Sequence, residues 1–350
     1  MEKDVLFNPI LEHGNLLIIG NGFDLDLGFK TGYKDFVNNE NSDDCGAFPF
    51  ARGAVIHSKL GKYIQSTTFI KEWYDLENIL AEYGKEVESP SFDIDFLGVR
   101  INASKIVSDT ADILTQKNKV ENDANDKHDY YKLVESLSLY LKSIDLCKPN
   151  TDSIAARLLR ALYKNPASPA PNLYSFNYTD LQVIGCALGL SVGEVNHIHG
   201  CLKNDNIILG VGDYVDLRDE VDYMYKTSNM SYQSTRLFEA LEECDNIFIF
   251  GLSLSQVDYP YFATFFKNLA SGGFGHVKKF VRIFTYDNES RAAILRNLRR
   301  MNNGMIDLMN RCDLDIIRTK DNVDESKVVS ILEKIETEGD FDSDKTHFHF

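Results

Sequence analysis

Residues 16–25 of this 350-residue chain read Leu-Leu-Ile-Ile-Gly-Asn-Gly-Phe-Asp-Leu. The four apolar residues Leu16–Ile19 have the length and composition of a buried strand. The Gly20–Gly22 segment then predicts a tight turn, and we expect a helix to start directly after it. A strand that passes through a glycine-rich turn into a helix is typical of an α/β fold, so this stretch decides the fold class.

Further strands are predicted only after residue 170, and they alternate with helices. The predicted strands are Asn172–Phe176, Val195–His199, Ile207–Leu209, Asn246–Phe250, Lys279–Thr285 and Leu314–Arg318. The predicted helices lie near Thr179–Gly189, Ser231–Glu243, Arg291–Met301 and Glu325–Glu336. Such alternation predicts a parallel sheet covered by helices on both faces. We therefore expect an α/β protein with a doubly wound, mostly parallel, Rossmann-like sheet.

The segment between the first and second strands has a different character. Helical spacing of apolar residues dominates it, which predicts a large helical insertion over residues 34–165. Its expected helices lie at Trp73–Tyr83, Ile101–Leu114, Tyr130–Leu146 and Ile154–Tyr163, with a polar loop at Gln116–Lys127. The α/β domain would then consist of residues 1–33 and 166–337, and residues 338–350 would form a mobile tail.

The composition limits the range of functions. The chain carries 37 Lys and Arg against 53 Asp and Glu, a net charge of −16. This charge disfavours a nucleic-acid partner, because binding to phosphates needs a basic surface. No apolar run approaches the roughly 20 residues of a membrane span, and the charged N-terminus does not resemble a signal peptide. The six cysteines include no Cys-x-x-Cys pair, so we expect a reduced, cytoplasmic protein without a membrane contact.

Ligands of an open parallel sheet collect at the carboxyl ends of its strands, and four predicted strand ends carry unusual residues. At the first, the backbone N–H groups of Gly20–Gly22 could approach a phosphate, although a tight turn that needs glycine explains the same residues. At the second, Asn177 could orient a ribose hydroxyl or a water molecule, while Thr179 or Asp180 could simply cap the next helix.

The third and fourth strand ends carry histidine and serine. His199 is a candidate for proton transfer, because the Gly200 that follows it leaves room for a substrate. His197 could be a structural histidine, or it could form a metal-binding pair with His199, although no further metal-binding motif supports that pair. The segment Gly251–Asp258 could contact an adenosine ribose or a phosphate, with helix capping by Asp258 as the alternative.

The order of these elements resembles the bacteriophage abortive-infection family AbiH over about residues 15–270. The matching elements are Gly20–Leu25, Thr31, Tyr33, Phe36, Trp73–Glu77, Phe176–Thr179, His197–Gly200, and Gly251–Leu254 with Asp258. Each element is short, but together they form a specific set. The resemblance implies a role in defence against bacteriophage.

A more distant resemblance is to the sirtuin-like NAD-binding fold. It implies that the glycine turn holds the pyrophosphate of NAD, that Asn177 lies beside the nicotinamide ribose, and that His199 acts as the base. Ser253 would contact the adenosine half of NAD. The zinc module of the sirtuin deacetylases is absent, so protein deacetylation is not expected. Asp24 replaces a small residue near the expected phosphate, and its carboxylate could instead contact a ribose hydroxyl.

The residues and the resemblances together predict an anti-phage enzyme that hydrolyses the nicotinamide N-glycosidic bond of NAD. Asn177 and His199 would be the catalytic residues, NAD would be the substrate, and no metal is expected. The residues expected to bind the nucleotide are Gly20, Asn21, Gly22, Asp24, Thr31, Tyr33, Gly251, Ser253 and Asp258.

Two other functions fit the same residues. The chain could be a non-catalytic sensor that binds an adenine nucleotide and signals to a partner. It could also be a metal-dependent hydrolase or nuclease that uses His197 and His199. For the leading function the expected partner is a small-molecule nucleotide, and the sequence is compatible with a homo-oligomer and with a phage-derived trigger of unknown identity.

Overall fold

The computed structural model describes most of the chain, and that part divides into two compact units. The described residues are 14–37, 60, 63–64, 73–85, 94–96, 99–101, 126–164, 169–233, 235–274, 279–302 and 304–338. The first unit, called the sheet unit, spans residues 1–30, 145–203 and 233–350. The second unit spans residues 31–144 and 204–232. Each unit is described below by itself.

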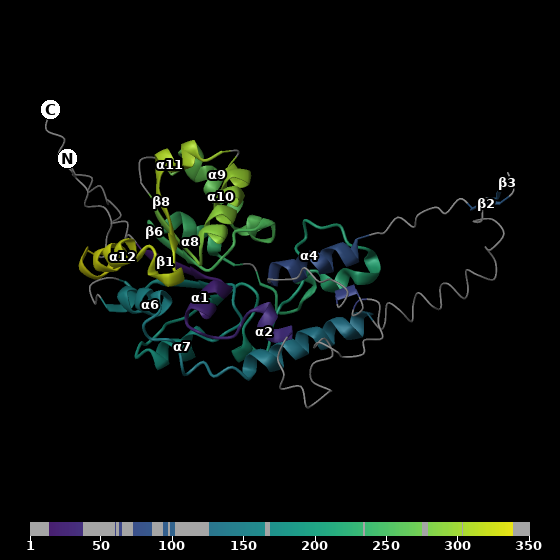
Figure 1. Cartoon of the computed structure of the whole chain (residues 1–350), viewed down its shortest axis with the longest axis horizontal. Coiled ribbons are helices and arrows are strands. Elements are labelled where there is room, and N and C mark those ends of the chain that lie inside the picture. Colours follow the sequence, from purple (N-terminus) through teal and green to yellow (C-terminus); the bar gives the residue numbers. More distant parts are fainter. Residues whose placement is uncertain are drawn as a thin grey trace, which may run out of the picture. The chain divides into compact units, whose positions relative to one another are not determined.

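The sheet unit contains six parallel strands, and they confirm the predicted doubly wound sheet (Figure 1). The strands are β1 (Asn15–Ile19), β4 (Asn172–Ser175), β5 (Asn196–His197), β6 (Asn246–Phe250), β7 (Lys279–Thr285) and β8 (Cys312–Arg318). Their order in the sheet is β5-β4-β1-β6-β7-β8. Along the chain, β4 and then β5 are added on one side of β1, and β6, β7 and β8 are added in turn on its other side. The direction of winding reverses between β1 and β6, which is where open α/β sheets bind ligands.

The register of the central strands brings their carboxyl ends to the same level. Ile19 of β1 lies opposite Ser175 of β4 and Phe250 of β6. The ladder continues one residue further, because Phe176 N donates to Ile19 O at 2.9 Å and Gly20 N donates to Phe250 O at 2.9 Å. The segments that follow β1, β4 and β6 therefore start side by side at one edge of the sheet.

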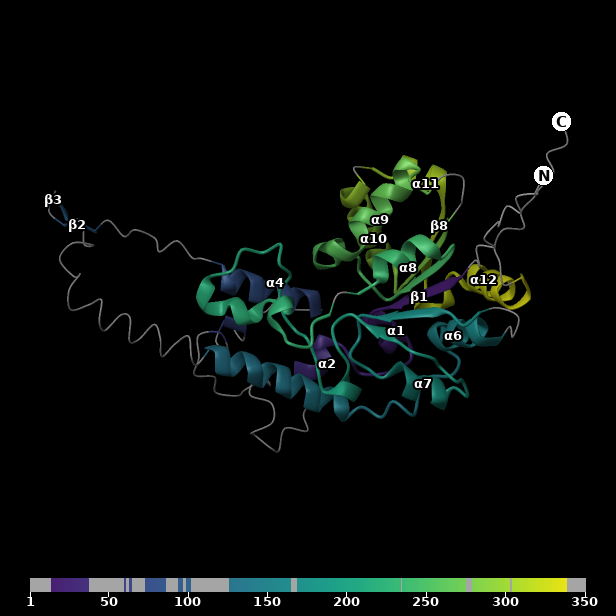
Figure 2. The same ribbon diagram turned by 180° about the vertical axis from the view of Figure 1, so that it is seen from behind.

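Helices cover both faces of the sheet (Figures 1 and 2). On one face α6 (Ile154–Lys164) packs against α12 (Glu325–Glu338) and α1 (Asn21–Asp26). The helices on the other face are α8 (Leu237–Glu243), α9 (Tyr259–Ser271), α10 (Asn288–Asn302) and α11 (Ile306–Arg311). Because β1 and β6 are buried on both faces, they are apolar and do not alternate after their first residues, Asn15 and Asn246. An eighth α-helix described in this unit, α7 (Leu181–Ala187), follows β4.

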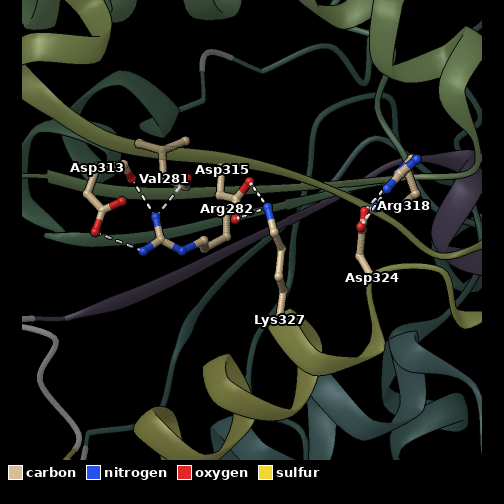
Figure 3. Close-up of polar contacts among 7 residues, drawn as sticks. All are labelled: Val281, Arg282, Asp313, Asp315, Arg318, Asp324 and Lys327. Carbon is tan, nitrogen blue, oxygen red and sulfur yellow. Dashed lines mark hydrogen bonds and ion pairs between the residues drawn. The ribbon is translucent and has the colours of Figure 1, made fainter.

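Ion pairs stabilise the β8 edge of the sheet (Figure 3). The Arg282 guanidinium of β7 contacts the Asp313 carboxylate of β8 at 3.0 Å. Lys327 Nζ of α12 contacts the Asp315 carboxylate at 2.9 Å. The loop after β8 contains a third pair, between Arg318 and Asp324 at 2.7 Å. These contacts attach the edge strand to its neighbour and to α12.

Several predicted elements of the sheet unit are shorter in the structure, and two of its helices, α9 and α11, were not predicted. The predicted strand Val195–His199 is reduced to the two residues of β5, because Ile198 and His199 already form a turn. The predicted helix Ser231–Glu243 begins only at Leu237. Helix α9 has no predicted counterpart, since it is rich in aromatic residues and has Pro260 in its first turn.

The second unit contains both helices and irregular segments. Its described residues include the helices α2 (Tyr33–Val37), α4 (Trp73–Gly84) and 126–142, and the short 3₁₀ helices η3 (Asp219–Met224) and η4 (Lys226–Ser228). Lys226 Nζ contacts the Glu77 carboxylate of α4 at 2.8 Å, and both side chains are buried. The predicted strand Ile207–Leu209 is wrong, because these residues are buried in this unit without pairing in a sheet.

The division into units differs from the predicted domain boundaries. The predicted insertion ended at residue 165, whereas residues 145–164 belong to the sheet unit and residues 204–232 to the second unit. Helix α6 joins the sheet unit because it packs on α12, and because Ala155 N donates to the Asp26 carboxylate of α1 at 2.8 Å.

Other predicted elements fall wholly or partly outside the described residues. Ile101 ends the short strand β3 (Val99–Ile101), which pairs with β2 (Ile94–Phe96). Residues 102–114 of the helix predicted there, residues 116–125 of the polar loop and residues 339–350 of the tail lie outside the described residues. Among the helices that the structure does describe, none has the length and apolar character needed to span a membrane.

Candidate functional site

The turns after β1 and β6 touch each other through their backbones. Gly22 N donates to Gly251 O at 3.0 Å. A Cβ atom on Gly22 would lie 2.6 Å from Gly251 Cα, and a Cβ on Gly251 would lie 2.4 Å from Gly22 Cα. Gly251 also has a φ of +71°, which side chains other than glycine rarely tolerate. Both glycines are therefore needed for close packing at the point where the winding of the sheet reverses.

The N–H groups of this turn are already used within the protein. Gly20 N donates to Phe250 O, Gly22 N donates to Gly251 O, and Phe23 N donates to Gly20 O. Helix α1 has only six residues, with Asn21 as the first and Gly20 as its N-cap. Because the donors are paired, the predicted binding of pyrophosphate by the Gly20 and Gly22 N–H groups has no support in this arrangement. The tight turn, the alternative reading, accounts for both glycines.

Asn177 connects the segment after β4 to the turn after β1. Its side-chain Nδ2 donates to Gly20 O at 3.0 Å, and only 7% of the residue is exposed. The Ser175 hydroxyl accepts from Asn177 N and donates to Asn177 O, both at 3.1 Å, which holds the loop in place. The structure therefore places this predicted catalytic amide at the carboxyl edge of the sheet, next to the reversal point.

Asp24 is a buried carboxylate beside the same loop. The Thr179 hydroxyl donates to Asp24 Oδ2 at 2.8 Å, and the residue is 1% exposed. Asp24 Oδ1 is buried and accepts no hydrogen bond within the described part of the chain. Burial raises the pKa of Asp24 to about 7, and the Thr179 hydroxyl and the nearby Asn177 amide oppose this rise only in part. The site thus contains a carboxyl group that titrates near neutral pH.

The two histidines of the His-x-His element lie in different surroundings. His197 Nδ1 lies 3.1 Å from Asn177 O, and burial lowers the pKa of this histidine. His199 Nε2 lies 3.5 Å from the Tyr261 hydroxyl of α9, and its ring meets the Phe176 ring edge-on at 5.4 Å between centroids. His197 therefore fits the structural role, and His199 is packed against the Phe176 and Tyr261 rings.

A metal site does not emerge from these residues. Within the part of the chain that the structure describes, no group of three or more His, Cys, Asp or Glu side chains could hold a metal ion. The different contacts of His197 and His199 agree with this finding.

Ser253 and Asp258 belong to a capping network. Asp258 Oδ2 accepts from Ser255 N at 2.9 Å and from the Ser253 hydroxyl at 3.3 Å, and Asp258 and Ser255 form a capping box. Asn297 of α10 donates to Ser253 O at 3.1 Å. The capping alternative therefore describes Asp258 well, and the predicted nucleotide contacts of Ser253 and Asp258 stay predictions.

The other predicted site residues belong to the second unit. Thr31 and Tyr33 are both buried, and burial raises the pKa of Tyr33 to about 12. Glu77, of the Trp73–Glu77 element, is paired with Lys226, so its role is structural. The place of Thr31 and Tyr33 beside nicotinamide stays a prediction.

Sequence reasoning missed two contacts that shape the site. Thr179 or Asp180 was predicted to cap the next helix; Asp180 is the cap, and the Thr179 hydroxyl donates to Asp24. Tyr261 was not singled out at all, because an aromatic residue in the first turn of a helix carries no distinctive signal. Only the packing of α9 against the end of β5 identifies it.

The fold and the site define a class of protein: a doubly wound α/β protein with an amide, a buried carboxylate and a histidine in the segments that follow β4, β1 and β5. Within this class the chain belongs to the bacteriophage abortive infection AbiH family, whose family model matches residues 16–274. Membership of this family indicates a role in abortive infection. No curated protein and no solved structure matches the chain.

Proposed function

We propose that the chain is an anti-phage effector that hydrolyses the N-glycosidic bond between nicotinamide and ribose in NAD. The observation that carries the proposal is the position of Asn177, which lies on Gly20 O at the reversal point of a parallel sheet, beside a carboxyl group that titrates near pH 7. Nucleotides bind at such points in α/β sheets. Loss of NAD would stop metabolism in an infected cell, which fits abortive infection.

The proposed reaction makes modest chemical demands. Nicotinamide leaves as a neutral molecule, so no general acid is needed. Water supplies the new bond to the ribose C1′ atom, and its proton must go to a base. The site must also stabilise the positive charge that develops on the ribose ring. NAD and water would give ADP-ribose, nicotinamide and a proton.

The residues of the site can be given roles in this reaction. We assign Asn177 to the orientation of the ribose and the attacking water, and His199 to the removal of the proton. Asp24 would act as a positioning residue, because it holds the Asn177 loop through the Thr179 hydroxyl. The Gly20 and Gly22 N–H groups are paired within the protein, so we assign them no contact with NAD. The role of the glycine turn is to let the backbones after β1 and β6 approach each other closely, which shapes the site.

The proposal can be tested by the release of nicotinamide from NAD by the purified protein. Asn177→Ala and His199→Ala should each lower the rate by about 100-fold or more. Asn196→Ala is a matched control, because Asn196 is also an asparagine with a backbone contact, to Leu173 O at 3.4 Å, and it should keep its activity. The same variants should be compared for NAD content in phage-infected cells, since an effector can be silent before infection.

Two results would replace the proposal. Tight binding of an adenine nucleotide without any product, together with protection of cells by the His199→Ala variant, would indicate the non-catalytic sensor. Activity that is lost on chelation and restored by a divalent metal ion would indicate the metal-dependent hydrolase or nuclease.

A further inference from the structure

Helix α10 carries an unusual concentration of arginine. It contains Arg291, Arg296, Arg299 and Arg300 against the single acidic residue Glu289. All four arginines are exposed, and Ile294, Leu298 and Met301 on one side of the helix are buried. Arg291 lies at the edge of that buried side, because it precedes Ile294 by three residues and Leu298 by seven. The spacing of Arg296, Arg299 and Arg300 places these three on the face turned away from the core.

The surrounding segment has the opposite charge to the chain as a whole. Residues 259–311, which run from the start of α9 to the end of α11, contain nine Lys and Arg but only three Asp and Glu. The whole chain has a net charge of −16. Lys279 and Arg282 of this segment are buried in β7 and paired with Asp245 and Asp313, so the exposed basic residues of α10 are the ones available to a partner. At physiological ionic strength charges more than about 8 Å away are largely screened, so the acidic remainder does not cancel this patch.

Internal contacts do not explain these arginines. Within the described residues no side chain of these four forms an ion pair or a hydrogen bond. Arg299 and Arg300 lie in the last turn, where a positive charge favours the helix. Arg291 and Arg296 gain little from that effect, and Arg296 and Arg300 repel each other at i,i+4 spacing.

The chemistry of the patch favours a polyanion over a protein partner. Protein interfaces are usually centred on large apolar or aromatic side chains. The exposed residues of α10 include none of these, since its exposed positions are arginine, alanine, asparagine and glutamate. Interfaces with nucleic acids are more polar and strongly basic, and the guanidinium group suits phosphate oxygens.

We propose that the outer face of α10 binds the phosphate backbone of a nucleic acid. Arg296, Arg299 and Arg300 lie within about 6 Å along the helix axis, so their long side chains can meet neighbouring phosphates of one strand or duplex. The net charge of −16 disfavours a nucleic-acid partner for the chain as a whole, but it does not describe the charge on one face of one helix. The inner side of the same helix reaches the 252–258 loop through Asn297, so the patch is on an element that also supports the candidate site.

The proposal can be tested by fluorescence anisotropy with labelled oligonucleotides of about 20 nucleotides, as single-stranded DNA, duplex DNA and RNA. We expect binding at low salt that weakens steeply as salt rises. The combined variant Arg296→Ala, Arg299→Ala, Arg300→Ala should bind at least tenfold more weakly. Its plot of log K against log salt should be shallower by about 2 to 3 units for duplex DNA, close to one unit per lost arginine.

Two control variants separate this site from a general effect of charge. Arg160→Ala, Lys164→Ala, Lys327→Ala removes the same number of positive charges from α6 and α12 on the other face of the sheet, and it should bind like the wild type. Arg→Lys at the three α10 positions keeps the charge and should retain most of the affinity. Circular dichroism would check that each variant is folded.

Several results would overturn the proposal. The proposal is wrong if the wild-type protein binds none of the three nucleic acids at low salt. Equal loss of binding in the α10 variant and in the α6 and α12 variant would show that the site is not on α10. Binding of polyglutamate in preference to all three nucleic acids would identify an acidic protein as the partner.

Discussion

Two buried aspartates of the sheet unit, Asp24 and Asp324, have opposite surroundings. Asp324 accepts hydrogen bonds from the Arg318 guanidinium at 2.7 and 2.8 Å, and this pairing lowers the pKa of Asp324 to about 2 (Figure 3). Asp24 accepts one hydrogen bond, from the Thr179 hydroxyl, and burial raises its pKa to about 7. The presence of a cation, and not burial alone, decides the charge of each carboxyl group.

The comparison separates a structural carboxylate from a functional candidate. Asp324 also accepts from Arg318 N at 2.8 Å, so its contacts hold the loop after β8. Asp24 has no such cation, and its ionised form is destabilising in the folded protein. A residue that costs stability at neutral pH and lies beside Asn177 is a better candidate for a role in activity than one with every contact satisfied.

The largest expected effect is the removal of the Asp24 charge. Because the pKa of Asp24 is raised above its unfolded value of 3.8, its contribution to stability is fully present below about pH 4 and is lost as the pH rises through 7. Asp24→Asn imitates the protonated form, so its stability relative to wild type should increase by about 3 kcal/mol between pH 5 and pH 8. Urea unfolding at a series of pH values measures this difference.

A neighbouring aspartate provides the control for that experiment. Asp180 caps α7 by accepting from Gln182 N at 2.9 Å, and asparagine caps a helix equally well. Asp180→Asn should therefore leave the pH dependence unchanged. If Asp24→Asn shows the same constant difference from wild type at pH 5 and pH 8, the carboxyl group does not titrate near 7 and the comparison fails.

The second effect has the opposite sign. The lowered pKa of Asp324 means that its stabilisation is present above about pH 4 and is lost as the pH falls through 2. Asp324→Asn should cost about 1–2 kcal/mol at pH 7, because it leaves the Arg318 guanidinium with a weaker acceptor. The cost should shrink as acid is added. A cost that is unchanged at pH 2.5 would contradict the ion pair.

A third, smaller effect concerns the hydroxyl that binds Asp24. Thr179→Val removes a donor to Asp24 Oδ2 and should raise the pKa of Asp24 further. We expect a loss of about 1 kcal/mol at pH 8 and a smaller loss at pH 5, where the carboxyl group is largely protonated. Nicotinamide release should fall too if the hydroxyl positions the Asn177 loop. Full activity across the pH range would contradict this positioning role.

The smallest effect is expected for Arg318→Lys. Lysine keeps the positive charge near Asp324 but cannot reproduce the two parallel hydrogen bonds of the guanidinium. The loss at pH 7 should stay below about 1 kcal/mol, and the pKa of Asp324 should stay below its usual value. Titration of Asp324 by NMR would detect the change. A return of the Asp324 pKa to 3.8 would show that the two parallel hydrogen bonds of the guanidinium, and not its positive charge, lower this pKa.

The sequence predicted the sheet more successfully than the site. Long apolar runs such as Asn246–Phe250 and Lys279–Thr285 are buried strands, and the structure confirms both ranges. The strand prediction for Ile207–Leu209 was wrong, because a short run of buried apolar residues has the same composition whether or not it pairs in a sheet. In the site, the position of Asn177 could be predicted from its place after a strand. The burial of Asp24 could not, because it depends on Thr179, which is 155 residues away in the chain.

The central place of β1 has a consequence for synthesis on the ribosome. This strand is made first, yet its neighbours β4 and β6 come much later, and Asn15 meets Asn246 across a separation of 231 residues. Such a long closure costs little extra stability, because its entropy grows only slowly with length. It does fix an order in time, since the contact between Gly22 and Gly251 must wait for β6 to emerge. A nascent or prematurely terminated chain that ends before β6 therefore lacks the contact between the two glycine turns.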